Sequence, residues 1–221
     1  MELRRGSVDW TGPGGVDRSR LSMRKELFGV FGDRSAFERL REPGAFDAVV
    51  GDGPLTVGVR DPALGMPGRS DVHTDDAGVC VVWGEAYAPN GNTASAEWVE
   101  RAVAERGRAA LADLDGSYLV ALARDGEAFV ATDPIRSWEC FYTDAPGVRT
   151  FGTDLTPVEE TVADPRVRRD ALLEFLHLGT VLGEKTLFER AARLPIDRSQ
   201  SVVPPSSIRR NHPGAPASST C

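Results

Sequence analysis

The chain has 221 residues, a length that fits one globular domain with a sizeable core. Its 26 basic and 33 acidic residues give a net charge of −7, which argues against general binding to nucleic acid or to an anionic membrane surface. No apolar run approaches the roughly 18 residues of a membrane-spanning helix, and the first residues lack the continuous apolar core of a secretory signal. We therefore expect a cytoplasmic protein without a membrane or nucleic-acid partner.

Composition divides the chain into three zones. Residues 1–22 are rich in Gly, Arg and Ser and show no hydrophobic periodicity, so we expect a disordered N-terminal extension. Residues 23–195 alternate apolar runs, turn signals and helical patterns, and form the expected domain. Residues 196–221 hold many prolines and serines and one acid, Asp197, which predicts a disordered tail. A second interpretation is that both ends are translated segments foreign to the ancestral domain.

Short apolar runs separated by turn signals predict a strand-rich domain. In chain order, strands are expected at residues 27–31, 46–50, 55–60, 79–83, 117–123, 128–132, 140–142 and 148–152. Turn signals join three pairs of them into hairpins: GDGP at 51–54, Asp125-Gly126, and Pro146-Gly147. Residues 62–76, rich in polar residues, glycine and proline, are expected to form a loop.

Helical periodicity is present at residues 35–41, 94–106 and 168–178. Asp33 or Ser35 is the expected cap of the first helix. The second and third helices are amphipathic, with apolar residues gathered on one face. Antiparallel hairpins with helices set apart from them predict an α+β fold of layered sheets covered by helices.

Cysteine and histidine positions predict no metal site. Cys80, Cys140 and Cys221 form no CxxC pair, and we interpret them as reduced thiols, with Cys80 buried inside a strand. His73 and His177 have no partner at metal-ligand spacing, so we expect them to be ordinary surface or helix residues.

Four segments, in the same order along the chain, resemble the N-terminal domain of the asparagine synthase family. They are LFGVFG at 27–32; VWGEAY at 82–87; a group of LDGSYLVAL at 114–122, FVATD at 129–133 and FGTDL at 151–155; and FLHLG at 175–179 with KTLFE at 185–189 and RLP at 193–195. That domain is a class II glutamine amidotransferase of the N-terminal nucleophile (Ntn) type. The resemblance covers residues 23–195 and implies an αββα four-layer sandwich of two antiparallel sheets.

The resemblance also implies a glutaminase site, but the chain lacks its chemistry. The family attacks the glutamine side chain with an N-terminal cysteine, and this position falls on Arg24 or Lys25. The family holds the oxyanion with the Asn and Gly of an Asn-Gly-Glu stretch. Gly84 and Glu85 match that stretch, whereas its Asn position falls on Trp83.

Two substrate-holding positions are altered or ambiguous. The Asp that holds the glutamine α-amine in the family falls on Ser95. An Arg ahead of Asn-Gly-Glu grips the α-carboxylate, and Arg60 or Arg69 could fill that role. We therefore expect no catalytic residue, and a vestigial ligand site made of Arg60, Gly84 and Glu85.

Ordinary structural roles compete with these assignments. Residues 84–87 also fit the end of a strand with a tight turn. Asp133 and Arg136 lie where the family has a hairpin, and we interpret this acid as structural.

The sequence favours a truncated, glutaminase-inactive amidotransferase-like domain from a parent that forms amides with ATP, as in asparagine biosynthesis. The chain has no Ser-Gly-Gly-x-Asp-Ser phosphate loop, so we expect no cofactor in it; ATP and Mg²⁺ would belong to the missing synthetase domain. The expected partners are an amino-acid ligand and either a second copy in a homodimer or that missing domain. Two alternatives stay open: a non-catalytic module that binds a small, amino-acid-like molecule, and an unrelated α+β protein whose motifs match by accident.

Overall fold

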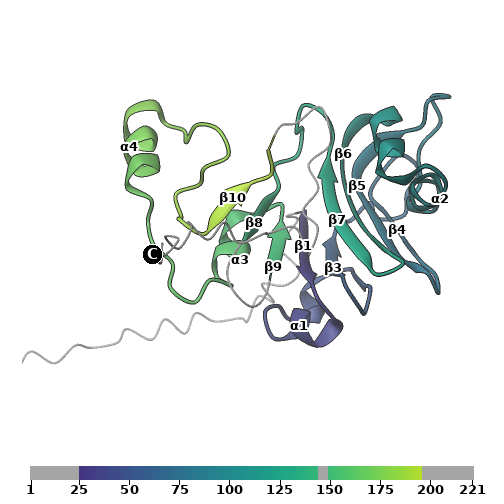
Figure 1. Ribbon diagram of the computed structural model, residues 1–221, viewed down its shortest axis with the longest axis horizontal. Helices are drawn as coiled ribbons and strands as arrows, with labels where there is room; N and C mark the ends of the chain where they lie inside the picture. The colour runs from purple at the N-terminus through teal and green to yellow at the C-terminus, as the bar shows by residue number, and fades with distance from the viewer. Residues whose placement is uncertain (1–24, 144–148, 196–221) are drawn as a thin grey trace, which may run out of the picture.

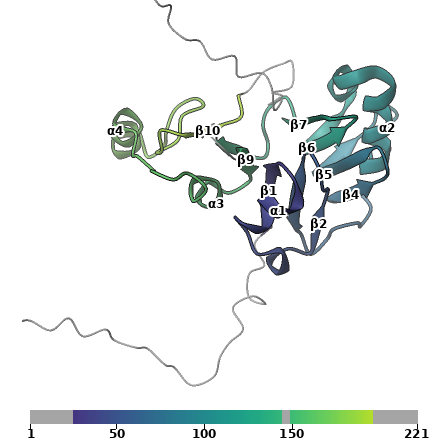
Figure 2. The same ribbon diagram turned by 60° about the horizontal axis from the view of Figure 1, so that its bottom comes forward.

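The computed structural model describes residues 25–143 and 149–195, and it shows two antiparallel sheets packed face to face between outer helices (Figure 1; Figure 2). The segments 1–22 and 196–221, predicted to be disordered, lie outside the described residues. None of the described helices is long and apolar enough to cross a membrane.

Within the described residues the strands form two sheets. The six-stranded sheet has the spatial order β10 (Ala191–Arg193), β8 (Phe141–Thr143), β9 (Arg149–Gly152), β1 (Glu26–Phe31), β3 (Thr56–Arg60), β2 (Ala48–Val50). The four-stranded sheet has the order β4 (Asp71–Thr74), β5 (Gly78–Tyr87), β6 (Asp115–Arg124), β7 (Glu127–Thr132). Every strand pair in this part of the chain is antiparallel, as predicted.

The main core lies between the sheets, because alternate residues of a strand point to opposite faces. On β5, Val79, Val81 and Trp83 enter this core. Leu27 of β1 and Phe151 of β9 meet them from the six-stranded sheet. All five side chains are at most 3% exposed, so the two sheets share one continuous apolar layer.

The described residues form four α-helices. They are α1 (Arg34–Glu38), α2 (Ala96–Arg106), α3 (Leu155–Glu159) and α4 (Arg169–Leu178), with 3-10 turns at Pro43–Ala45 and Gly107–Asp113. Of these helices, α1, α2 and α3 cover the outer faces of the sheets. The other residues of β5, Cys80 and Val82, pack with Val99 of α2. Phe37 of α1 and Val158 of α3 pack on the opposite face of the six-stranded sheet. The layers follow the order α, β, β, α, which confirms the predicted four-layer sandwich.

Local turn chemistry accounts for the hairpins that the sequence predicts. Asp125 and Gly126 have φ values of 52° and 81°, and a type I′ turn requires positive φ at both central residues. This turn joins β6 to β7. The predicted hairpins β2–β3 and β8–β9 also form. Asp33 is the N-cap of α1, and its Oδ1 accepts the Ala36 N–H at 2.8 Å.

The predicted loop at 62–76 is wrong in part, because Asp71–Thr74 form β4. This edge strand pairs with β5 along its whole length, and Val72 is its only large apolar residue. Asp71 Oδ2 accepts the Ala96 N–H of α2 at 2.9 Å. The polar residue Asp71, which favoured a loop in the prediction, is therefore used in a contact between the strand and a helix. The short elements α3 and β10 were not predicted either, since tertiary pairing determines them.

The predicted third helix is present as α4, but its apolar face is not buried against the described residues. Ala171 is its buried residue, whereas Leu173, Phe175 and Leu176 are between 45% and 68% exposed. In Figure 1 this helix projects from the body, on the side away from α2.

Candidate functional site

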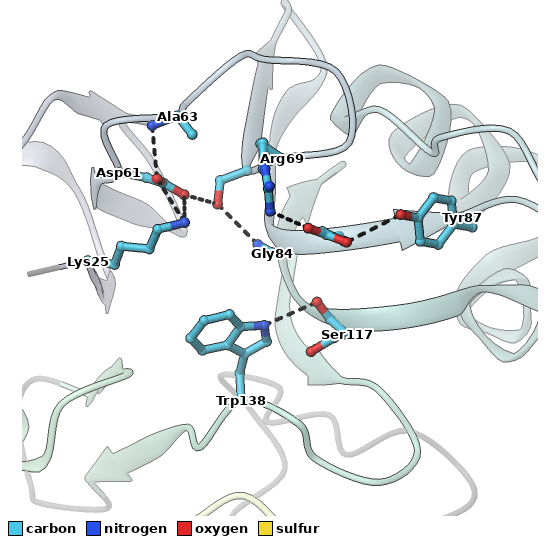
Figure 3. A network of polar contacts seen from close by, with 10 residues as sticks. Lys25, Asp61, Ala63, Arg69, Gly84, Tyr87, Ser117 and Trp138 are labelled. Carbon is cyan, nitrogen blue, oxygen red and sulfur yellow. Dashed lines mark hydrogen bonds and ion pairs between the residues drawn. The ribbon is translucent and has the colours of Figure 1, made fainter.

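A chain of polar contacts joins the two sheets at the end where β1 begins and β3 finishes (Figure 3). The antiparallel pairing of β1 with β3 puts Lys25 and Asp61 side by side, and Lys25 Nζ lies 3.1 Å from Asp61 Oδ1. Ser70 Oγ donates to Asp61 Oδ2 at 2.6 Å and accepts the Gly84 N–H at 3.1 Å. The fold therefore brings Lys25 and Gly84, two positions singled out by the family resemblance, into one network.

Asp61 is the centre of this network. Its side chain is 1% exposed, and its Oδ1 also accepts the Ala63 N–H at 3.0 Å. Burial by itself raises the pKa of a carboxyl, but hydrogen bonds from Ser70 and Ala63 and the charge of Lys25 outweigh it and hold the pKa of Asp61 below its ordinary value. Asp61 is thus ionised at neutral pH and balances the charge of Lys25.

Backbone geometry requires glycine at position 84. Gly84 has a φ of +89°, and a Cβ added there would lie 2.4 Å from Ser117 O and 2.6 Å from Trp138 Nε1. Trp138 is held in place because its indole N–H donates to Ser117 O at 3.1 Å (Figure 3). Residues 84–87 are the last four residues of β5, and a turn follows in which the Gly91 N–H donates to Ala88 O at 2.8 Å, so the interpretation of this stretch as a strand end is confirmed.

Trp83 is a core residue. Its ring packs edge-on against Trp138, with centroids 6.0 Å apart and planes at 73°. Its Nε1 is buried and has no hydrogen-bond partner among the described residues. An unpaired buried N–H costs about 1–3 kcal/mol, which apolar packing must offset. The position that the resemblance assigns to an oxyanion donor is thus filled by an indole between the sheets.

Glu85 forms an ion pair with Arg69, in the segment between β3 and β4. Tyr87 Oη donates to the other carboxylate oxygen, Glu85 Oε2, at 3.3 Å. The Arg69 and Glu85 side chains are 51% and 39% exposed, so the pair lies at the edge of the network, within reach of solvent.

Arg60, which was predicted together with Gly84 and Glu85, makes contacts on the outer face of the six-stranded sheet. Arg60 Nε donates to Ala45 O at 2.6 Å, and its Nη2 lies 3.4 Å from Glu26 Oε2. Its guanidinium lies 5.5 Å from the centre of the Phe46 ring, in the outer layer of the six-stranded sheet. Of the two candidate arginines, the fold brings Arg69 to Glu85.

Two other motif residues have structural roles. Ser95 is the N-cap of α2, where its Oγ accepts the Trp98 N–H at 3.2 Å. Asp133 is buried, and its carboxylate accepts the backbone N–H groups of Ile135 and Ser137 at 3.0–3.2 Å. The prediction that Asp133 is structural is confirmed.

The described residues offer no thiol that could act as a nucleophile. Cys80 and Cys140 are fully buried, and desolvation raises the pKa of both thiols, so they stay protonated at neutral pH. The prediction that Cys80 is buried inside a strand is confirmed. Arg24 and Cys221 lie outside the described residues.

Comparison with known proteins adds a low-level likeness. No protein-family model matches the sequence, and a search of curated proteins found no match. One similar solved structure is glutamine phosphoribosylpyrophosphate amidotransferase from B. subtilis, complexed with ADP and GMP, with 11% identity and a TM-score of 0.39 over 84% of this chain and 44% of that chain. Another is an allosteric regulatory enzyme of purine biosynthesis, with 11% identity and a TM-score of 0.40 over 81% of this chain and 43% of that chain.

The chain thus spans less than half the length of these two similar structures. At this identity and TM-score the likeness carries no argument about family or activity. The αββα arrangement rests instead on the strand order and the three core clusters themselves.

Sequence reasoning missed Asp61, Ser70 and Trp138. None of the three lies in a motif of the family, and Ser70 precedes the strand that was taken for loop. In the network that they complete, Asp61 pairs with Lys25, and Ser70 links Asp61 to Gly84 by hydrogen bonds. Such an arrangement can orient a polar ligand at its exposed edge, but it contains no activated nucleophile.

Substituting Gly84 by Ala is expected to destabilise the protein by about 3 kcal/mol, because the cost of left-handed backbone adds to the steric overlap with Ser117 and Trp138. The matched control is Gly91→Ala, since Gly91 has a φ of +80° but nothing within 4 Å of the added Cβ. That control should lose only about 1–2 kcal/mol. Urea unfolding measures both values, and equal losses would contradict the close packing described at Gly84.

Replacing Asp61 by Asn should destabilise the protein by about 2 kcal/mol at pH 7, because the buried charge-assisted hydrogen bonds and the ion pair are lost. The pKa of Asp61 is lowered in the folded state, so its contribution is complete above the ordinary pKa of 3.8 and is lost as the pH falls below it. Unfolding free energies of the two proteins should therefore converge as the pH falls through the lowered pKa of Asp61. A difference that persists unchanged at low pH would show that Asp61 acts through packing alone.

Proposed function

We propose that this chain is a glutaminase-inactive, class II amidotransferase-like domain related to the N-terminal domain of asparagine synthases. The observation that carries the proposal is the ion pair between Lys25 and the buried Asp61. The resemblance assigns the nucleophile to position 24 or 25, and at position 25 the chain has an ammonium held by a carboxylate. A protonated, ion-paired amine has no lone pair with which to attack an amide.

The surroundings of Gly84 support the same proposal. An oxyanion hole needs N–H donors aimed at the developing negative charge, and the loss of one donor costs roughly 3–4 kcal/mol of transition-state stabilisation. Here the Gly84 N–H already donates to Ser70 Oγ, and the second donor position is Trp83, whose ring lies in the core. Both the nucleophile and the oxyanion site are therefore replaced by structural contacts.

A parent protein with this domain would form an amide with ATP, using free ammonia or another amine in place of glutamine. The resemblance to asparagine synthases supports this part of the proposal. ATP and Mg²⁺ would then bind to a synthetase domain outside this chain, and that domain is the proposed partner of residues 23–195.

We expect the full chain to release no glutamate from millimolar glutamine above the rate of a protein-free blank. A coupled glutamate dehydrogenase assay measures this, with an active class II glutaminase as the positive control. The double variant Cys80→Ala, Cys140→Ala is assayed in parallel, since it removes both described thiols. Turnover that scales with the wild-type protein and persists in this variant would contradict the proposal.

We propose as a second candidate that the site binds a small amino acid without transforming it, as the vestigial pocket of such a domain. The observation that favours this function is the half-exposed Arg69–Glu85 ion pair. A zwitterionic amino acid offers a carboxylate to Arg69 and an ammonium to Glu85, so it can exchange one internal ion pair for two with the ligand. Tyr87 orients Glu85 for this exchange.

A thermal-shift screen against the common amino acids tests this candidate. A ligand present at 100 times its Kd stabilises the protein by about 2.7 kcal/mol, which raises the Tm of a domain of this size by roughly 5–10 °C. Arg69→Ala should abolish the shift, whereas Arg106→Ala, which removes the comparably exposed pair with Asp113, should keep it. If no amino acid raises the Tm, or if Arg69→Ala responds like the wild type, the site does not bind amino acids.

A further inference from the structure

Three side chains with metal-binding atoms meet at the outer face of the four-stranded sheet, away from the site described above. They are His73 of β4, Asp75 in the turn after it, and Glu100 of α2. One ligand atom from each lies within 4.8 Å of the other two. The sequence separates Glu100 from the other two by a strand and a loop, so no local spacing could predict the cluster.

The register of β4 explains why His73 lies under α2. Asp71 and His73 are two residues apart on one strand, so their side chains stand on the same face of the sheet. The Asp71 carboxylate bonds to the Ala96 N–H at the start of α2, which shows that this face is the one that α2 covers. Glu100 lies four residues after Ala96, one helical turn further along the same face of α2.

Glu100 is the most unusual member of the cluster. The residue is 5% exposed, and its Oε1 forms an ion pair with Nη1 of Arg124 at the end of β6. Arg124 Nε also lies 3.3 Å from the exposed carboxylate of Asp125. One guanidinium is thus shared between two acids, so the buried Glu100 has a cationic partner whose charge also serves Asp125.

Asp75 is fixed in an orientation that leaves one oxygen for a ligand. Its Oδ1 accepts the N–H groups of Ala77 and Gly78, both at 2.9 Å. These bonds, followed by smaller effects of nearby charges, hold the pKa of Asp75 below its ordinary value, so the carboxylate is ionised at neutral pH. Both bonds use Oδ1, and Oδ2 can therefore face a cation.

A cavity of about 540 Å³ opens beside the cluster. Its wall includes Asp75 and Arg124, and the additional acids Asp52, Asp76 and Asp125. The acids outnumber the basic groups in this wall, so the cavity attracts cations. Of the three cluster residues, Asp75 is the one that lines this cavity. Three protein ligands would leave coordination positions on an ion for water or for a small ligand.

We propose that His73, Asp75 and Glu100 bind a divalent transition-metal ion of the Zn²⁺ or Mn²⁺ type. One imidazole and two carboxylates without a thiolate suit these ions better than Ca²⁺ or Mg²⁺, which prefer oxygen ligands alone. Ligand bonds of about 2.1 Å bring neighbouring ligand atoms to about 3–3.5 Å, so the three side chains close by about 1 Å around the ion. Arg124 then moves from Glu100 to Asp125, since the ion takes over the charge of Glu100.

Isothermal titration of the metal-free, untagged full chain with ZnCl₂ and with MnCl₂ tests the proposal, together with the shift in Tm. We expect one site, with Mg²⁺ giving no comparable heat. His73→Ala should weaken binding at least tenfold. Asp75→Asn should do the same while its remaining oxygen keeps the turn. His177→Ala is the matched control, because His177 is an exposed histidine on α4 whose loss should change the affinity less than twofold.

Arg124→Gln separates a built site from adventitious binding. In this variant the competing cation is gone, so the apoprotein should have a lower Tm and the added metal should bind more tightly and restore the Tm. Circular dichroism checks the fold of each variant. If the His73→Ala protein is misfolded, the affinity of Asp75→Asn for the metal decides the test. The proposal is overturned if neither ion binds, or if His73→Ala and Asp75→Asn both bind as tightly as the wild type.

Discussion

The burial of β5 on both faces is the constraint on which the layered structure depends. Val79, Val81 and Trp83 fill the space between the sheets, and Cys80 and Val82 fill the space under α2. A shift of one residue in the pairing of β5 with β6 would exchange these two sets, so the register is strongly specified. Because one strand supplies side chains to two cores, its ends are also where polar groups from different layers meet.

The parts of the fold that could be predicted from sequence are those in which local chemistry decides the structure. Asp125-Gly126 determines its turn whatever surrounds it, and apolar runs identify most of the central strands. The strand β4 could not be recognised, because its residues Asp71 and His73 are polar. Both face α2, and the hydrogen bond of Asp71 to the start of that helix exists only in the folded protein. The exposed leucines of α4 mark the reverse case, in which a helical pattern was correctly predicted but its burial was not.

The candidate site shows the same division between local and tertiary information. Gly84 and Glu85 could be singled out from a motif, and Lys25 from its place at the first strand. Asp61 and Ser70 could not, since their role arises only when the end of β3 meets the four-stranded sheet. The sequence could not choose between Arg60 and Arg69, since both precede the motif. The fold places the Arg60 guanidinium beside the Phe46 ring and pairs Arg69 with Glu85.

Asp61 and Glu100, two buried carboxylates near β5, differ in how their negative charges are balanced. Asp61 accepts hydrogen bonds from a hydroxyl and a backbone N–H and pairs with Lys25, so its charge is satisfied by the fold itself. Glu100 pairs with Arg124, and it shares this arginine with Asp125. A buried charge is retained at a cost of several kcal/mol unless its partners are well placed. The first carboxylate therefore stabilises the junction of the sheets, whereas the second, with His73 and Asp75 beside it, supplies a ligand atom to the proposed metal site.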